Sequence, residues 1–217
     1  SSVPRGISMI PLFSNGRINK ETSFLFYTPG SFTSTIGNNV SVSFTTVTDF
    51  PADGNIAITV NTNSKIAYPL LFRRPYWSKD FSIQINGRKQ ASDGKEFISI
   101  NRLWKKGDKI EISFAMPLQV INGGRNYPGH VAFQRGPHVL AFDDKLNGFA
   151  AENLAVDTFA FTLRKSELVL PQGWIGGLAF ELINNKTTSS KRIILVPFAD
   201  ASQNGGTVAT WIKTSSN

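Results

Sequence analysis

Two histidines, His130 and His138, are the only imidazole groups of the chain and its first candidates for metal ligation or proton transfer. On a single strand they would share a face but lie about 26 Å apart, because a strand advances about 3.3 Å per residue. No acidic residue stands beside them at ligand spacing. The chain has no cysteine, which excludes disulfides, thiolate nucleophiles and cysteine-ligated metals. We therefore expect no metal and no cofactor.

Carboxylates are the second group with chemical potential, because glycoside hydrolysis uses two of them a few ångströms apart. Asp143 and Asp144 are adjacent, so on a continuing strand their side chains would point to opposite faces. Asp49, Asp53 and Asp200 stand in turn-like surroundings rich in proline and glycine, where a turn or cap role is favoured. Neither a phosphate loop nor a nucleophile elbow occurs. We expect no catalytic residue in this chain.

Aromatic side chains could bind sugars, because a sugar ring stacks its C–H groups on a tryptophan or tyrosine face. The strongest candidate is Trp174 in "PQGWIGG", since flanking glycines can present it to solvent, and Trp77 and Tyr127 are further candidates. In a β protein with 12% aromatic residues, packing in a core or at an edge is the more frequent role. Both readings stay open at this point. The remaining aromatic residues considered are Tyr76, Trp104 and Trp211.

The charge of the chain raises the question of a polyanionic partner. Its formal net charge is +8, and eleven basic residues lie between Lys65 and Lys109. They occur singly or in pairs among apolar residues, and no run of five like charges exists. We therefore expect neither nucleic acid nor a membrane as partner, since there is also no apolar run of about 20 residues and no signal-peptide pattern at the start. For a soluble chain, the periplasm, the cell exterior and the cytoplasm all stay open.

The elements that must position these side chains are strands. Apolar residues alternate with polar ones almost everywhere after Ser23, as in "VSVSF" (40–44) and "IAITV" (56–60), between clusters of glycine, proline and asparagine. The pattern predicts an all-β fold of two antiparallel, jelly-roll-like β-sandwiches with a short helix over Pro4–Phe13. A boundary near Met116–Leu118 divides the chain. The predicted parts are an N-terminal segment (1–21), a first sandwich (22–117) and a second sandwich (118–217).

The stretch "INRLWKKGDKIEI" (100–112) looks like a basic and aromatic binding surface, but alternation favours a strand, a turn and a strand. A directly paired hairpin would need an odd loop such as 105–107, with Gly107 left-handed and Asp108 beginning the next strand. Trp104 and Arg102 then share the inward parity, so Arg102 should meet an aromatic face or a carboxylate. Asn86-Gly87 is a strong signal for a tight hairpin turn. We expect these six residues to be structural.

Four blocks of the sequence resemble one family. They are "LLFRRPYWSKDFSIQINGR" (70–88), "EFISINRLWKKGDKIEISFAMP" (96–117), "GHVAFQRGPHVLAF" (129–142) and "ILVPFADA" (194–201). In order and spacing they resemble the region after the catalytic barrel in the β-L-arabinofuranosidases of glycoside hydrolase family 127. "FYTPGSF" (26–32) is similar to the start of the first domain after that barrel.

This resemblance implies an (α/α)6 barrel that carries the chemistry, followed by two β-sandwiches. The family's zinc-bound cysteines and catalytic glutamate belong to the barrel, and no residue of this chain matches them. The resemblance therefore implies a non-catalytic accessory portion that buttresses a barrel as its partner and leaves open a homodimer contact. The alternatives are a free-standing module that binds plant-type oligosaccharides through exposed aromatics, and a polyanion-binding domain.

Overall fold

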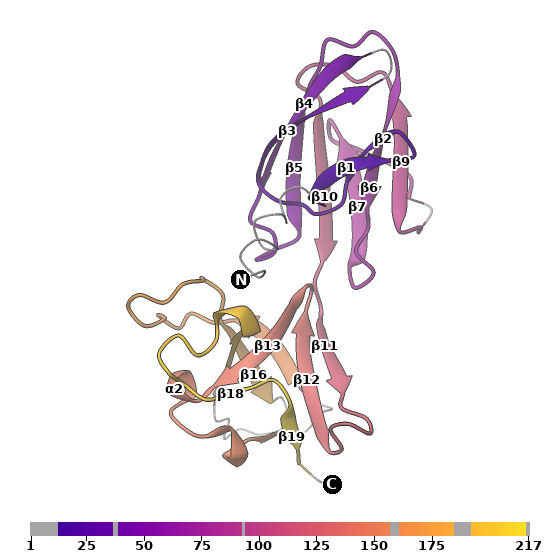
Figure 1. The fold of residues 1–217 in the computed structure, drawn as a ribbon. Coiled ribbons are helices and arrows are strands. Elements are labelled where there is room, and N and C mark those ends of the chain that lie inside the picture. Colours follow the sequence, from indigo (N-terminus) through magenta and orange to yellow (C-terminus); the bar gives the residue numbers. More distant parts are fainter. Residues whose placement is uncertain (1–12, 37–38, 93, 157–160, 185–191, 216–217) are drawn as a thin grey trace, which may run out of the picture. The chain divides into compact units, whose positions relative to one another are not determined.

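A computed structural model describes residues 13–36, 39–92, 94–156, 161–184 and 192–215 of the chain. The chain divides into two compact units, Ser1–Met116 and Pro117–Asn217. Strands dominate both units, so the all-β fold predicted from the sequence is confirmed (Figure 1). The helix expected over Pro4–Phe13 lies outside the described residues except for Phe13.

The first unit is a sandwich of two sheets. The four-stranded sheet has the order β1 (Asn15–Ile18), β2 (Glu21–Phe24), β6 (Tyr68–Arg73) and β9 (Phe97–Arg102). The six-stranded sheet has the order β3 (Gly30–Ile36), β4 (Val40–Thr48), β5 (Asn55–Asn61), β10 (Lys109–Ala115), β7 (Lys79–Ile85) and β8 (Arg88–Lys89). Strand β1 pairs with β2 although the sequence analysis left it in the N-terminal segment. Strands β2 and β6 are parallel, unlike their antiparallel neighbours.

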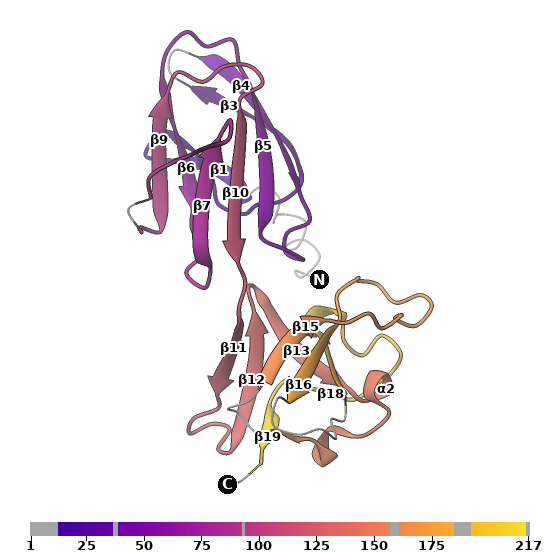
Figure 2. The ribbon, with the colours of Figure 1, turned by 180° about the vertical axis from the view of Figure 1, so that it is seen from behind.

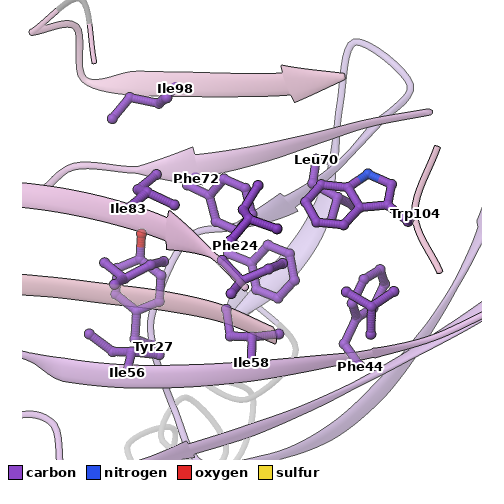
Figure 3. Close-up of a cluster of buried hydrophobic side chains, with 14 of the residues drawn as sticks. Phe24, Tyr27, Phe44, Ile56, Ile58, Leu70, Phe72, Ile83, Ile98 and Trp104 are labelled. Atoms are coloured by element: carbon purple, nitrogen blue, oxygen red, sulfur yellow. The ribbon is translucent and has the colours of Figure 1, made fainter. Parts of the chain in front are cut away.

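In this unit the alternation of apolar and polar residues in the sequence matches an alternation of buried and exposed side chains. In β5 every second residue, from Ile56 to Val60, is buried and the residues between them are exposed. The inward side chains of both sheets meet in one cluster, which contains Phe24 and Phe72 from one sheet and Phe44 from the other (Figure 3). The ring centres of Phe72 and Phe44 lie 5.1 and 5.3 Å from the ring centre of Phe24. The sandwich is therefore held together by a core rich in aromatic residues.

The strands on either side of "LWKKGD" are not a hairpin. Strand β9 pairs with β6, whereas β10 pairs with β5 and β7, so the chain crosses from one sheet to the other between Arg102 and Lys109. The prediction of strand, turn and strand holds, but the direct pairing is wrong. Alternation of apolar residues cannot distinguish a hairpin from a crossing between sheets. In both cases every second residue of each strand faces the core and is apolar.

The second unit is one hydrogen-bonded sheet of nine strands within the described residues (Figure 2). Its main path runs β14 (Ala155–Val156), β19 (Ile212–Thr214), β12 (His130–Arg135), β13 (His138–Asp143), β17 (Ile193–Pro197), β16 (Phe180–Asn184) and β15 (Phe161–Lys165). Two strands pair beside this path, β11 (Leu118–Asn122) with β12 and β18 (Val208–Ala209) with β13. Strand β11 pairs antiparallel with β12, and β14 runs parallel to β19.

Two apolar clusters lie on the two faces of this sheet. One cluster collects residues from several strands of the sheet, such as Val131 of β12 and Phe180 of β16. The other cluster contains Ile194 and Val196. All five residues of β17 are buried, which explains the unbroken apolar run in its sequence. The described helices are short, namely α2 (Asp144–Asn147) and the 3-10 turns η2 (Ala151–Asn153) and η3 (Phe198–Asp200). Within the described ranges, no helix has the length and apolar character to cross a membrane.

Candidate functional site

The most elaborate polar arrangement of the first unit surrounds Asp108, at the turn between β9 and β10. Its carboxylate is nearly buried and accepts hydrogen bonds from Asn86 Nδ2 at 2.8 Å and from the backbone N–H of Lys105 at 2.9 Å. Asn86 Oδ1 in turn accepts from Lys109 N at 2.9 Å. Gly107 has φ 85° and its N–H donates to Val60 O, which ties the turn to β5. We call Asn86, Arg102, Trp104, Lys105 and Asp108 the Asp108 cluster.

The arginine and tryptophan of this cluster face inward, in agreement with their parity. Trp104 is fully buried and its indole Nε1 donates to Tyr68 O at 2.9 Å. The guanidinium of Arg102 lies 5.2 Å from the Trp104 ring centre and 3.7 Å from Asp108 Oδ2. Lys105 and Lys106 are exposed. With the indole buried and the carboxylate engaged by two N–H donors, the tryptophan and the aspartate of the cluster serve to fix the turn.

The tight hairpin turn signalled by Asn86-Gly87 is present between β7 and β8. Ile85 pairs with Arg88, so Asn86 and Gly87 alone form the loop, with φ values of 50° and 76°. Positive φ at both positions is what such turns require. Because Asn86 also binds Asp108, one residue serves the hairpin and the neighbouring turn together.

Two of the three aromatic candidates for sugar binding are covered by the protein itself. Trp77 is partly buried against the first core and stacks on Phe50 at 6.3 Å, with Phe114 at its edge. Trp174 packs against the cluster of Ile194 and Val196, and its indole Nε1 is buried. The glycines around Trp174 therefore do not lift it into solvent, because an apolar patch beneath the loop offers it cover.

The third candidate, Tyr127, lies differently. Its side chain is 47% exposed and stacks on Trp211, with ring centres 4.6 Å apart and planes inclined by 12°. Trp211 is partly buried and precedes β19. This is an aromatic pair with one ring still open to water.

The histidines and paired aspartates are structural in their geometry. His130 and His138 begin the two strands of a hairpin rather than sharing one strand, and within the described residues no three histidine or carboxylate side chains gather closely enough to hold a metal ion. Asp143 is fully buried and caps α2 by accepting from Lys145 N, while its other oxygen accepts from Ser202 N. Asp144 accepts from Thr207 N. The cap role expected of these carboxylates fits this geometry.

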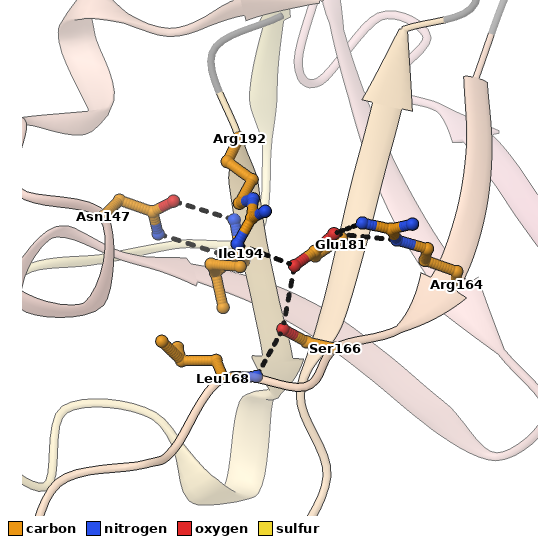
Figure 4. Close-up of polar contacts among 7 residues, drawn as sticks. All are labelled: Asn147, Arg164, Ser166, Leu168, Glu181, Arg192 and Ile194. Carbon is orange, nitrogen blue, oxygen red and sulfur yellow. Dashed lines mark hydrogen bonds and ion pairs between the residues drawn. The ribbon is translucent and has the colours of Figure 1, made fainter.

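A buried carboxylate that sequence reasoning missed is Glu181 on β16 (Figure 4). Its side chain is 4% exposed and accepts from Arg164 Nε and Nη2 at 2.8 and 2.6 Å. Arg192 Nη1 lies 3.5 Å away, and Ser166 donates at 3.3 Å. Burial alone would raise the pKa of Glu181, but the hydrogen bonds and charges of Arg164, followed by the charge of Arg192, hold it below 4.5. The group is therefore an ion-paired carboxylate, unsuited to act as a general acid. We call these four residues the Glu181 cluster.

An open hollow of about 450 Å³ lies on the outward side of the six-stranded sheet. Asp49, Asp53 and Glu111 line it, and the small side chain of Ala57 lies between Val47 and Glu111 in the strand register. Asp53 Oδ1 accepts from Asn55 N within its turn, while Asp49 and Glu111 are exposed. A glycosidase pair needs two carboxyls in contrasting environments. The geometry of this hollow does not provide that contrast.

Comparisons with known proteins now become informative. Residues 25–116 match the family model of the β-L-arabinofuranosidase GH127 middle domain. The match contains two of the four sequence blocks, those at 70–88 and 96–116. No curated protein matches the sequence.

Solved structures match nearly the whole chain. The GH127 β-L-arabinofuranosidase from Geobacillus stearothermophilus T6 superposes with a TM-score of 0.84 at 22% identity, over 99% of this chain and 37% of that one. A glycoside hydrolase gives 0.81 at 19% identity, over 98% and 39%. A GH127 β-arabinofuranosidase gives 0.82 at 18% identity, over 98% and 38%.

At these identities the matched structures establish a shared fold, and the chain spans less than two-fifths of their length. The family model is independent of them and covers most of the first unit. The resemblance to glycoside hydrolase family 127 read from the sequence is therefore confirmed, by a family match over residues 25–116 and by a common fold over almost the entire chain.

Proposed function

We propose that this chain is a non-catalytic accessory portion of a larger glycoside hydrolase, whose catalytic groups lie in a barrel outside it. The observation that carries the proposal is the GH127 middle-domain match, in a chain that spans less than two-fifths of the hydrolases sharing its fold. The buried carboxylates of the described residues support it. Asp108, Asp143 and Glu181 are all engaged in caps, turns or ion pairs.

The proposal is tested by assaying the purified chain on aryl β-L-arabinofuranosides, with the β-L-arabinofuranosidase from G. stearothermophilus as positive control. We expect no turnover above background from this chain. Turnover that co-elutes with the protein, and that the substitution Glu111→Gln in the open hollow abolishes, would contradict the non-catalytic assignment.

The second part of the proposal is a mechanical role for the chain. A sandwich with a stiff aromatic core can buttress a neighbouring barrel and supply a contact between subunits. Analytical ultracentrifugation of the chain over a wide concentration range tests the subunit contact. A reversible dimer supports it, whereas a monomer at every concentration removes the homodimer from the proposal.

A further inference from the structure

The stacked pair of Tyr127 and Trp211 is not explained by either apolar core. Neither residue belongs to the clusters of the second unit, and the two are brought together from the β11–β12 loop and from the segment before β19. Trp211 stacks on the Tyr127 ring, and Tyr127 as a residue is still 47% exposed, so the ring pair is partly open to solvent.

The loop that carries Tyr127 is held in place by its own backbone. Tyr127 N donates to Gly123 O, His130 N donates to Tyr127 O, and Gly123 N donates to His130 O. A Cβ atom on Gly123 would meet Tyr127 O at 2.2 Å, so the close passage of the chain requires glycine there. Thr214 N and Oγ1 both donate to Gly129 O, which ties the loop to β19 and hence to the segment of Trp211. The ring is thus preorganised, and binding to it costs little ordering entropy.

The other three tryptophans of the chain pack on an apolar cluster. Trp104 is fully buried in the first core, Trp77 is partly buried against that core, and Trp174 packs on a cluster of the second unit with its Nε1 buried. Arg125 and Asn126 directly precede Tyr127 in the same loop, and both are exposed residues that carry hydrogen-bond donors. A partly exposed aromatic ring in a loop with polar side chains matches the two-sided chemistry of a sugar, whose ring has an apolar C–H face and a rim of hydroxyls.

We propose that Tyr127, supported by Trp211, is a platform on which a sugar ring of an oligosaccharide stacks. The platform lies in the second unit, outside the family match, and does not depend on whether the chain is the accessory portion of a hydrolase. It would hold a glycan chain by one of its rings.

The experiment titrates arabinohexaose, xylohexaose and cellohexaose into the full chain by calorimetry, with saturation-transfer NMR on the same samples. We expect saturable binding of at least one of them, with the largest transfer to ring C–H protons. Tyr127→Ala should weaken that binding about tenfold or more, because it removes the stacking area and the aromatic contact together. Tyr127→Phe keeps the ring and should bind within about twofold of the unmodified chain.

Tyr76→Ala is the matched control, since Tyr76 is 81% exposed in the first unit and should not affect binding. Trp211→Phe keeps an aromatic support and should retain binding. Far-ultraviolet circular dichroism of each variant establishes that it is folded. Two results would overturn the platform: no saturable binding of any probe up to roughly 10 mM, or equal affinities of the unmodified chain and Tyr127→Ala. The first would mean that the ring pair contacts protein rather than sugar.

Discussion

The Asp108 cluster and the Glu181 cluster are two solutions to one problem, that of holding a carboxylate inside a β protein. Asp108 is held by neutral donors, the Asn86 amide and the Lys105 backbone N–H, with Arg102 further off at 3.7 Å. Glu181 is held by charge, with Arg164 in double contact and Arg192 nearby. The first carboxylate shapes a turn, whereas the second joins strands β15 and β16.

The difference lies in how the partners are brought together. Two of the partners of Asp108, Arg102 and Lys105, lie within six residues of it, and the third is the turn residue Asn86. Glu181 meets Arg164 only because β15 and β16 pair in the register that puts them opposite each other. A local cluster fixes a connection, while a long-range ion pair depends on the sheet already being formed.

The largest loss of stability is expected from removing the buried indole of the Asp108 cluster. Trp104→Ala should lower the free energy of unfolding by about 3–5 kcal/mol, because it leaves a large cavity and an unpaired Tyr68 carbonyl. Urea unfolding followed by circular dichroism measures the loss. Tyr76→Ala, at an 81% exposed site, is the control and should change little. Equal effects of the two substitutions would mean that the indole does not stabilise the unit.

Replacing Asp108 by asparagine tests whether this cluster depends on two acceptor oxygens. In Asp108→Asn an amide N–H₂ must face one of the two donors, Asn86 Nδ2 or Lys105 N, and we expect a loss of about 2 kcal/mol. Urea unfolding measures it, with Glu111→Gln on the following strand β10 as the exposed control. If the control loses as much stability, the carboxylate geometry is not the cause.

The substitution Glu181→Gln tests whether the stability contributed by the Glu181 cluster depends on pH, as an ion pair requires. The lowered pKa of Glu181 means that its ion pairs add stability above pH 4.5 and that this stability is lost as the pH falls through the folded-state pKa. We expect a loss of about 1–2 kcal/mol at neutral pH, limited because Arg164 and Arg192 are largely exposed. In acid, the variant and the unmodified chain should converge.

Urea unfolding at both pH values, with Glu167→Gln as an exposed control from the adjacent loop, measures this convergence. A difference that stays constant between neutral and acid pH would show that the charge of Glu181 contributes nothing to stability.

The smallest effect concerns the backbone of the turn. Gly107→Ala should cost about 1 kcal/mol, because φ is 85° although no atom lies within 4 Å of the added Cβ. Gly16→Ala is the matched control, since its Cβ position is also open and no positive φ is recorded there. The melting temperature of each variant gives the readout. Equal melting temperatures would remove backbone strain from the account of this turn.

Much of the fold was accessible from periodicity and turn chemistry. Alternation locates β4, β5 and β7, and Asn86-Gly87 identifies its hairpin, because these features involve neighbouring residues. Periodicity could not assign β9 and β10 to different sheets, since the inward sides of both sheets look alike in sequence. The covering of Trp174 was equally hidden, because the buried residues of the cluster beneath it are Ala179, just before β16, and Ile194 and Val196 of β17.

The sequence by itself determined the all-β class, the inward parity of Trp104, the tight turn at Asn86-Gly87 and the resemblance to glycoside hydrolase family 127. Those features follow from steric preferences and spacings within short stretches of chain. The tertiary structure alone decided that Glu181 would meet two arginines and that Tyr127 would stack on Trp211. Such contacts depend on strand register and on the crossing of distant segments, which short-range patterns do not encode.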